Sequence, residues 1–114
     1  MRKGEIWLIN LDPAIGSEIR KVRPAVIVSD DAVGILPLKV IVPITEWNDR
    51  YVIAPWLIKI EPDSVNGLGK LSAGDAFQVR SVATERFVKQ IGRLSEKTMG
   101  KIIYGLALVL GIRN

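Results

Sequence analysis

The chain has 114 residues, of which 48% are hydrophobic and 25% are charged, and this predicts one globular domain spanning residues 1–114 with a core of its own. It holds neither cysteine nor histidine, which excludes disulfides, thiolate metal sites and histidine-based acid–base catalysis, so we expect no cofactor and no metal. The formal net charge of +4 favours a polyanionic partner, either nucleic acid or an acidic protein segment.

The first half of the chain predicts three strands. The first spans residues 4–10 (GEIWLIN) and is followed by a loop rich in turn-forming residues. The second, AVIVS at 25–29, opens directly after an Arg-Pro pair, because proline is tolerated where a strand begins. The third, LKVIVPI at 38–44, is almost continuously hydrophobic, which predicts burial on both faces, and Thr45 stands at its exit.

The second half predicts three further strands. WLIKI at 56–60 alternates loosely and precedes an interval rich in turn residues. AFQVRSV at 76–82 alternates clearly, which puts Phe77 and Val79 on a buried face. RFVKQI at 86–91 adds one more short strand before the pattern changes period.

A C-terminal helix is predicted to begin after Ser95, its N-cap, and to end at Gly111, its C-cap. Gly100 and Gly105 within it indicate close packing of the helix on a sheet. Short strands followed by one helix predict an α+β, mainly β domain, in which a curled antiparallel sheet or small barrel carries the helix. The apolar stripe of the helix consists of Met99, Ile102, Ile103, Leu106 and Leu110.

The sequence shows neither a signal-peptide core nor a membrane-spanning stretch, and both bear on where the protein is located. The charged N-terminal residues 1–5 are followed by only a short apolar run, IWLI at 6–9, before the polar Asn10, so no signal-peptide core is expected there. The apolar C-terminal stretch is interrupted by Lys101 and is too short to span a bilayer. The sequence therefore predicts a cytoplasmic protein that has no membrane contact.

Charged side chains gather before the second strand, at Glu18, Arg20, Lys21 and Arg23. Such a run is either a solvated surface loop or a site held between two strands. Arg23 immediately precedes the buried run, so we expect it to be fixed at the edge of the sheet, where its planar guanidinium suits a phosphate. Thr45 would lie beside Arg23 if the second and third strands pair, or it is an ordinary strand-end threonine.

Other polar and aromatic side chains extend the candidate surface. Asp75, Gln78 and Arg80 form a second polar set at the strand predicted over 76–82, with Gln78 and Arg80 on its polar face, and they are either plain surface residues or line a nucleic-acid groove. Trp47 follows Thr45 in a polar loop and is a candidate for stacking on bases, although such residues also pack over barrel ends. Trp7, between two aliphatic residues, is predicted to be core.

Several of these segments together resemble the MazF/PemK (Kid-like) toxins of bacterial toxin–antitoxin pairs. The resemblance implies an SH3-like barrel with a C-terminal helix, of the PemK/CcdB-like kind, in a homodimeric endoribonuclease. Such an enzyme cuts single-stranded RNA without a metal and leaves a 2′,3′-cyclic phosphate and a 5′-hydroxyl. The matching segments are RKGEIWLINLDPAIGSE at 2–18, RPAVIVS at 23–29, VIVPIT at 40–45, FQVRSV at 77–82 and IGRLSEKTMGKI at 91–102.

The resemblance also implies roles for individual residues. The family's catalytic arginine and threonine map onto Arg23 and Thr45, and its loop glutamate maps onto Glu18. Arg23 would stabilise charge on the phosphorane oxygens and Thr45 would orient the phosphate, while Glu18 would serve as general base for the 2′-hydroxyl if partial burial raises its pKa. The residues expected to contact RNA are Ser17, Arg20, Lys21, Trp47, Gln78 and Arg80.

The chain departs from the family pattern at FQVRSV, because Phe77 stands where many members carry an acid and Asp75 stands where some carry an arginine. The resemblance further implies a cognate antitoxin whose acidic tail covers the RNA groove. Two alternatives stay open: a CcdB-type gyrase poison, whose C-terminal Trp-Gly-Ile this chain lacks, and an RNA-binding relative without catalytic activity.

Overall fold

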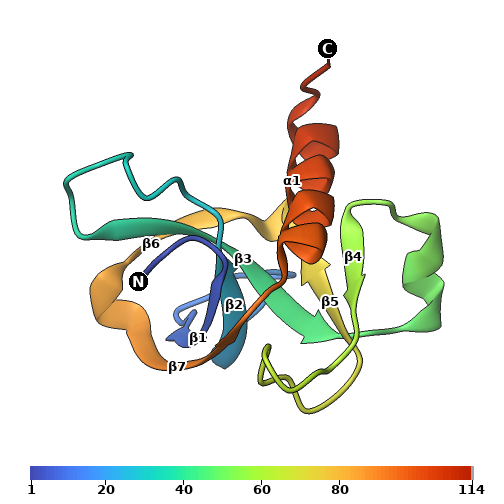
Figure 1. Ribbon diagram of the computed structural model, residues 1–114, viewed down its shortest axis with the longest axis horizontal. Coiled ribbons are helices and arrows are strands. Elements are labelled where there is room, and N and C mark those ends of the chain that lie inside the picture. The colour runs from blue at the N-terminus through green and yellow to red at the C-terminus, as the bar shows by residue number, and fades with distance from the viewer. Residues whose placement is uncertain (114) are drawn as a thin grey trace.

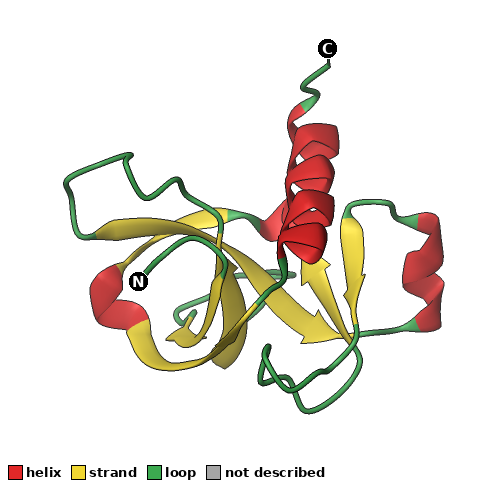
Figure 2. Ribbon diagram, in the orientation of Figure 1, coloured by secondary structure: helices red, strands yellow, loops and turns green. Residues whose placement is uncertain are grey.

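A computed structural model describes residues 1–113 and contains one antiparallel sheet, three short 3₁₀ helices and one long helix (Figures 1 and 2). None of the helices in this part of the chain is long and apolar enough to cross a membrane. The strands are β1 (Glu5–Asn10), β2 (Val22–Ile27), β3 (Leu38–Glu46), β4 (Leu57–Ile60), β5 (Ser72–Asp75), β6 (Arg80–Ala83) and β7 (Phe87–Arg93). The helices are η1 (Asp49–Ile53), η2 (Ala76–Gln78), η3 (Thr84–Arg86) and α1 (Glu96–Leu110).

The sheet curls around β3, its longest strand. The strand order is β4-β5-β3-β2-β1-β7, and β6 also pairs with β3. The first half of β3 pairs with β2 and β6, whereas its last three residues pair with β5, so the sheet bends along this one strand. The prediction of a curled antiparallel sheet with a C-terminal helix is confirmed, although the sheet is not closed, since its order ends at β4 and β7.

Each face of the sheet carries an apolar cluster. The helix-side cluster lies under α1 and includes Ile6, Val26, Val42, Ile44, Ile58, Ile60 and Ile102. The loop-side cluster, on the other face, consists of Ile9, Leu11, Ala25, Ile27, Ile41 and Val82, with Trp7, Ile19 and Phe87 packed against it. Residues 41–44 of β3 are buried throughout because side chains of this strand enter both clusters, which confirms the predicted burial on both faces for these four residues, whereas Leu38 at the start of the strand is exposed.

The helix has the predicted ends. Ser95 Oγ accepts a hydrogen bond from the Thr98 amide, and Gly111 adopts the left-handed conformation with φ of 70°. Gly105 packs closely, because a Cβ there would lie 3.3 Å from the Cβ of Ala76, whereas a Cβ at Gly100 would meet nothing within 4 Å. Close packing is therefore confirmed for only one of the two glycines.

The predicted apolar stripe of α1 is wrong at two positions, since Ile103 and Leu110 are exposed. The helix contacts the sheet along the line of Met99, Ile102 and Leu106, and its C-terminal half projects beyond the sheet (Figure 1). A helical period predicts which residues share a face, but it does not predict how much of that face the sheet covers.

The strand predicted at 76–82 is also wrong over its first half. Asp75 ends β5, and its carboxylate accepts a hydrogen bond of 3.1 Å from the Phe77 amide, so the chain turns through η2 before β6 begins. Phe77 is consequently 70% exposed instead of buried. An aspartate that caps a short turn competes locally with the strand, and alternation alone does not reveal that competition.

Other boundaries differ by a few residues. β2 begins at Val22, so Arg23 lies within the strand and not before it. β5 was not predicted, because its sequence SAGD has neither β-branched residues nor alternation. Trp7 is half-buried, since it lies at the edge of the loop-side cluster against the ring of Phe87.

Candidate functional site

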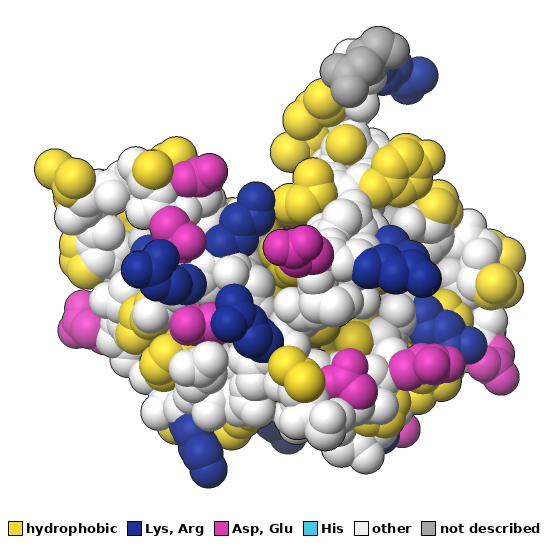
Figure 3. Space-filling model, viewed as in Figure 1, with side chains coloured by type: hydrophobic (Ala, Val, Ile, Leu, Met, Phe, Trp, Pro, Cys, Tyr) yellow, Lys and Arg dark blue, Asp and Glu magenta, His cyan; other side chains and the backbone are white. Residues whose placement is uncertain are grey.

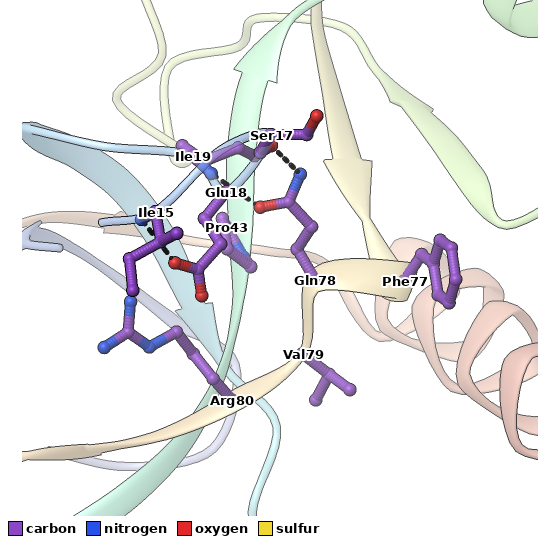
Figure 4. Close-up of a pocket in the computed structure, with 9 residues that line it drawn as sticks. All are labelled: Ile15, Ser17, Glu18, Ile19, Pro43, Phe77, Gln78, Val79 and Arg80. Atoms are coloured by element: carbon purple, nitrogen blue, oxygen red, sulfur yellow. Dashed lines mark hydrogen bonds between the residues drawn. The ribbon is translucent and has the colours of Figure 1, made fainter.

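The loop of residues 11–21, between β1 and β2, forms one wall of an open cleft of about 530 Å³ (Figure 4). Pro43 of β3 contributes to its surface, and η2 and the start of β6 form the facing wall. In Figure 4 the side chain of Phe77 points away from the cleft toward α1, although the residue belongs to its rim. The residues around the cleft are Ile15, Ser17, Glu18, Ile19, Pro43, Phe77, Gln78, Val79 and Arg80.

The tip of the loop is held by a local bond and by a distant side chain. The Ile15 amide donates to Glu18 Oε1 at 2.6 Å, which folds the tip back on itself. Gln78 reaches the loop from η2: its Oε1 accepts from the Ile19 amide at 2.6 Å and its Nε2 donates to the Ser17 carbonyl at 3.2 Å. The structure thus brings Ser17, Glu18, Gln78 and Arg80, all predicted site residues, to one cleft.

The base of the loop is held by aspartate and arginine side chains. Lys21 has a φ of 68°, and its amide donates to Asp12 Oδ1 at 3.0 Å. Arg80 Nη1 donates to the Leu11 carbonyl at 3.3 Å, and Arg86 Nη1 donates to the Asn10 and Asp12 carbonyls. The anchoring roles of Asp12 and Arg86 were missed by sequence reasoning, because Arg86 contacts residues more than 70 positions earlier and no local pattern marks such a pair.

Strand register places Arg23 and Thr45 on the same face of the sheet. Ala25 pairs with Pro43 in the β2–β3 ladder, and paired residues in an antiparallel ladder put their side chains on one face. Arg23 and Thr45 lie two residues beyond that pair, each about 7 Å further along its strand, and alternate residues share a face. Both therefore lie on the face of Pro43, beside the cleft but not among its lining residues.

Arg20, Lys21 and Arg23 are exposed, and the two arginine side chains hydrogen-bond to main-chain carbonyls. Arg23 Nε donates to the Arg20 carbonyl at 3.3 Å, and Arg20 Nη2 donates to the Gly16 carbonyl at 3.1 Å. Within residues 1–113, no carboxylate lies within ion-pair distance of Arg20, Lys21 or Arg23. Their positive charges are thus available to an anionic ligand on this surface.

Two predicted residues have surroundings that the sequence did not indicate. Glu18 is exposed, so the partial burial on which its assignment as a general base depended is absent in the single chain. Trp47 is held within its own segment: its Nε1 donates to Asp49 Oδ1 at 3.1 Å, and Lys59 Nζ lies 5.2 Å from its ring centroid. It does not line the cleft.

Beside the cleft, Asp75 is the carboxylate with a marked electrostatic perturbation. Burial raises the pKa of the Asp75 carboxyl above its ordinary value, and hydrogen bonds from Phe77 and Gln78 oppose this shift only in part. The raised pKa reflects a half-buried position at the base of η2. Among the residues that the structure describes, no group of three or more acidic side chains is arranged to hold a metal ion.

Solved structures of similar fold were identified by superposition. MazF from Deinococcus radiodurans matches with a TM-score of 0.80 at 23% sequence identity, over 98% of this chain and 97% of that one. An endoribonuclease from a mycobacterial species, solved in complex with its cognate antitoxin, matches with a TM-score of 0.79 at 21% identity, over 100% and 98% of the two chains. These matches define the fold class.

Sequence comparison defines the family. The family model of PemK-like, MazF-like toxins of type II toxin–antitoxin systems matches residues 2–110. The endoribonuclease MazF9 of Mycobacterium tuberculosis is 35% identical over 118 residues, which cover 98% of both chains. The endoribonuclease MazF of Staphylococcus epidermidis is 30% identical and covers 100% of this chain and 94% of its own. The chain belongs to the PemK-like, MazF-like toxin family.

Proposed function

We propose that this protein is the toxin of a toxin–antitoxin pair and a metal-independent, sequence-specific endoribonuclease that cuts single-stranded mRNA. The observation that carries this proposal is the register that puts Arg23 and Thr45 on one face beside the cleft. Family membership supports the same reaction, since the relatives reported above are named endoribonucleases. We place the activity in the cytoplasm, because the proposed mRNA substrate is found there.

In the proposed reaction the ribose 2′-oxygen attacks the adjacent phosphorus, and the bond to the 5′-oxygen breaks as a cyclic phosphate forms. The departing 5′-oxygen takes a proton from water and becomes the 5′-hydroxyl. The Arg23 guanidinium stabilises the negative charge that grows on the phosphate oxygens. The Thr45 hydroxyl orients the same phosphate. Glu18, as general base, takes the 2′-hydroxyl proton, and RNA bound in the cleft would supply the burial that the free loop lacks.

The remaining cations and polar groups would bind the strand on either side of the cut. Ser17, Arg20 and Lys21 are exposed on the loop, and Arg80 lies at the cleft wall. Phosphate contacts from such cations are weakened by salt, so RNA affinity should fall as ionic strength rises. Trp47 is proposed as a stacking platform only for nucleotides outside the cleft, because its indole is held by Asp49 and Lys59.

The proposal is tested with purified protein and a long single-stranded RNA in excess chelator. We expect cleavage with 2′,3′-cyclic phosphate ends, and a fall of about 100- to 1,000-fold in kcat for Arg23→Ala. Arg93→Ala, an exposed strand arginine away from the cleft, is the matched control and should cleave like the parent. Cleavage by Arg23→Ala near the parental rate would refute the mechanism, and RNA binding without any cleavage would instead support the non-catalytic alternative.

We also propose an acidic antitoxin segment and a second copy of the chain as partners. A mycobacterial relative is solved with its cognate antitoxin, and a basic surface favours an acidic ligand. Apolar side chains stay exposed along α1 (Figure 3), Tyr104, Leu108 and Leu110 among them, and a homodimer would bury them. RNA cleavage by an antitoxin-saturated protein would contradict the first partner, and a monomeric mass in sedimentation at micromolar concentration would contradict the second.

A further inference from the structure

Gln78 uses both ends of its side-chain amide on the main chain of the cleft loop. Its Oε1 accepts from the Ile19 amide at 2.6 Å, and its Nε2 donates to the Ser17 carbonyl at 3.2 Å. The two contacts bracket Glu18, the residue between them (Figure 4). A side-chain amide carries one acceptor and one donor group, so it can pair with a backbone carbonyl and an N–H at once.

The base from which Gln78 reaches is rigid. Gln78 is the last residue of η2, whose start is capped by the Asp75 carboxylate through the Phe77 amide. Ala76, the first residue of η2, is fully buried and packs against α1 at Gly105. The loop tip is exposed, whereas the side chain that holds it comes from a turn locked between the sheet and the helix.

Such a clamp has a consequence for chemistry on the loop. The two hydrogen bonds stabilise the observed conformation, so without them the Ser17–Ile19 segment would sample other conformations. Displacement of a reacting group by about 1 Å can lower a rate by about 100-fold. The orientation of Glu18 relative to Arg23 and Thr45 therefore depends on a residue about 60 positions later in the chain.

We propose that Gln78 is a positioning residue that clamps the 17–19 segment, and that its role is to orient Glu18 and not to read RNA. Its effect on catalysis rests on the proposed ribonuclease function, but the clamp itself is a property of the free protein. The proposal assigns a different role to a residue that the sequence predicted as an RNA contact.

The clamp is tested by amide hydrogen exchange of the full chain, followed by NMR at Ile19. In Gln78→Ala we expect the Ile19 amide to exchange about five- to tenfold faster, the loss of about one hydrogen bond. Gln90→Ala is the matched control, since Gln90 is exposed on β7 and, within residues 1–113, its side chain hydrogen-bonds only to the nearby Gly92 carbonyl. An Ile19 amide that exchanges at the parental rate in Gln78→Ala overturns the proposal.

A second variant tests the two hydrogen bonds of Gln78 separately. Gln78→Glu keeps an oxygen that can accept from the Ile19 amide but replaces the donor that faces the Ser17 carbonyl. We expect it to retain most of the slow exchange at Ile19 while its kcat falls. Exchange as fast as in Gln78→Ala would show that Oε1 does not protect this amide, and the clamp would be excluded.

RNA cleavage kinetics distinguish positioning from binding. For Gln78→Ala we expect kcat to fall about tenfold with KM close to the parental value, because the loop moves while the RNA contacts stay. A raised KM with unchanged kcat would make Gln78 an RNA contact and refute the proposal. If the parental protein cuts no RNA while the Ile19 amide responds as expected, the ribonuclease function fails and the clamp stands.

Discussion

The loop of residues 61–71 and the loop of residues 11–21 are both exposed for most of their length, yet they are held by different means. In the first, Asp63 Oδ1 accepts from the Val65 and Asn66 amides, and the buried Asn66 side chain bonds to residues at most five positions away. In the second, the local bonds of Glu18 and Asp12 are joined by side-chain hydrogen bonds from Gln78, Arg80 and Arg86, which lie 59–76 positions further along the chain.

This difference in how the two loops are held predicts that substitutions around one loop affect stability and substitutions around the other affect function. A loop whose hydrogen bonds join its own residues can form as soon as the adjacent strands fold, and it supports the fold directly. A loop held by distant side chains is set by the tertiary structure, so small changes in η2 or η3 reach the cleft without unfolding the protein. We therefore expect changes around the 61–71 loop to lower stability, and changes around the 11–21 loop to lower RNA cleavage.

The largest expected effect is a loss of stability on substitution next to the 61–71 loop. A Cβ at Gly92 would lie 2.4 Å from the carbonyl oxygens of Val65 and Asn66, which are backbone atoms and cannot move aside. Gly92→Ala should lower the free energy of unfolding by about 3 kcal/mol, measured by urea denaturation, and leave cleavage per folded molecule unchanged. Gly69→Ala in the same loop is the control, because a Cβ there meets nothing within 4 Å. Equal stability of the two variants would contradict the close packing.

A smaller effect is expected on RNA cleavage when a distant anchor of the 11–21 loop is removed. Arg86→Ala removes the donor to the Asn10 and Asp12 carbonyls at the base of the cleft loop. We expect cleavage to fall about tenfold while the free energy of unfolding falls by only about 1–2 kcal/mol, the worth of a charge-assisted contact. Arg50→Ala, whose side chain bonds only to Asn48 within its own turn, should cleave like the parent. Parental cleavage by Arg86→Ala would mean that the loop base does not need this anchor.

The smallest expected effect is a change in the pH dependence of stability. It concerns Asp75, which caps the turn that carries Gln78. Its pKa is raised by burial above 3.8, so its contribution to stability is full at pH values below 3.8 and is lost as pH rises through the folded-state pKa. Asp75→Asn keeps an oxygen for the Phe77 amide but cannot ionise. The variant should therefore gain stability relative to the parent as pH rises from about 3 to about 7.

The Asp75 prediction is checked by urea denaturation at several pH values across that range. Asp30→Asn, at an exposed aspartate, serves as the control and should show no comparable trend. If the stability of Asp75→Asn relative to the parent is independent of pH, or falls as pH rises, the burial of this carboxyl is contradicted.

Much of the fold and part of the candidate site were predictable from local patterns. The helix ends at Ser95 and Gly111 follow from capping chemistry, and the burial of β3 on both faces follows from its unbroken apolar run. The pairing of β2 with β3 was predicted as the condition for Arg23 and Thr45 to be neighbours, and the register meets it. Phe77 was misplaced because a capping aspartate turns the chain where alternation predicts a strand.

The amino-acid sequence by itself determined the class of fold, the two ends of the helix and the charged segment that bears Glu18 and Arg23, since each depends on residues within a few positions of one another. Only the tertiary structure decided that Gln78 and Arg86 hold that segment and that Phe77 faces away from the cleft. A hydrogen bond between residues 59 or more positions apart leaves no period, cap or turn signal in either segment. It exists only once the curled sheet has brought β1, η2 and η3 together.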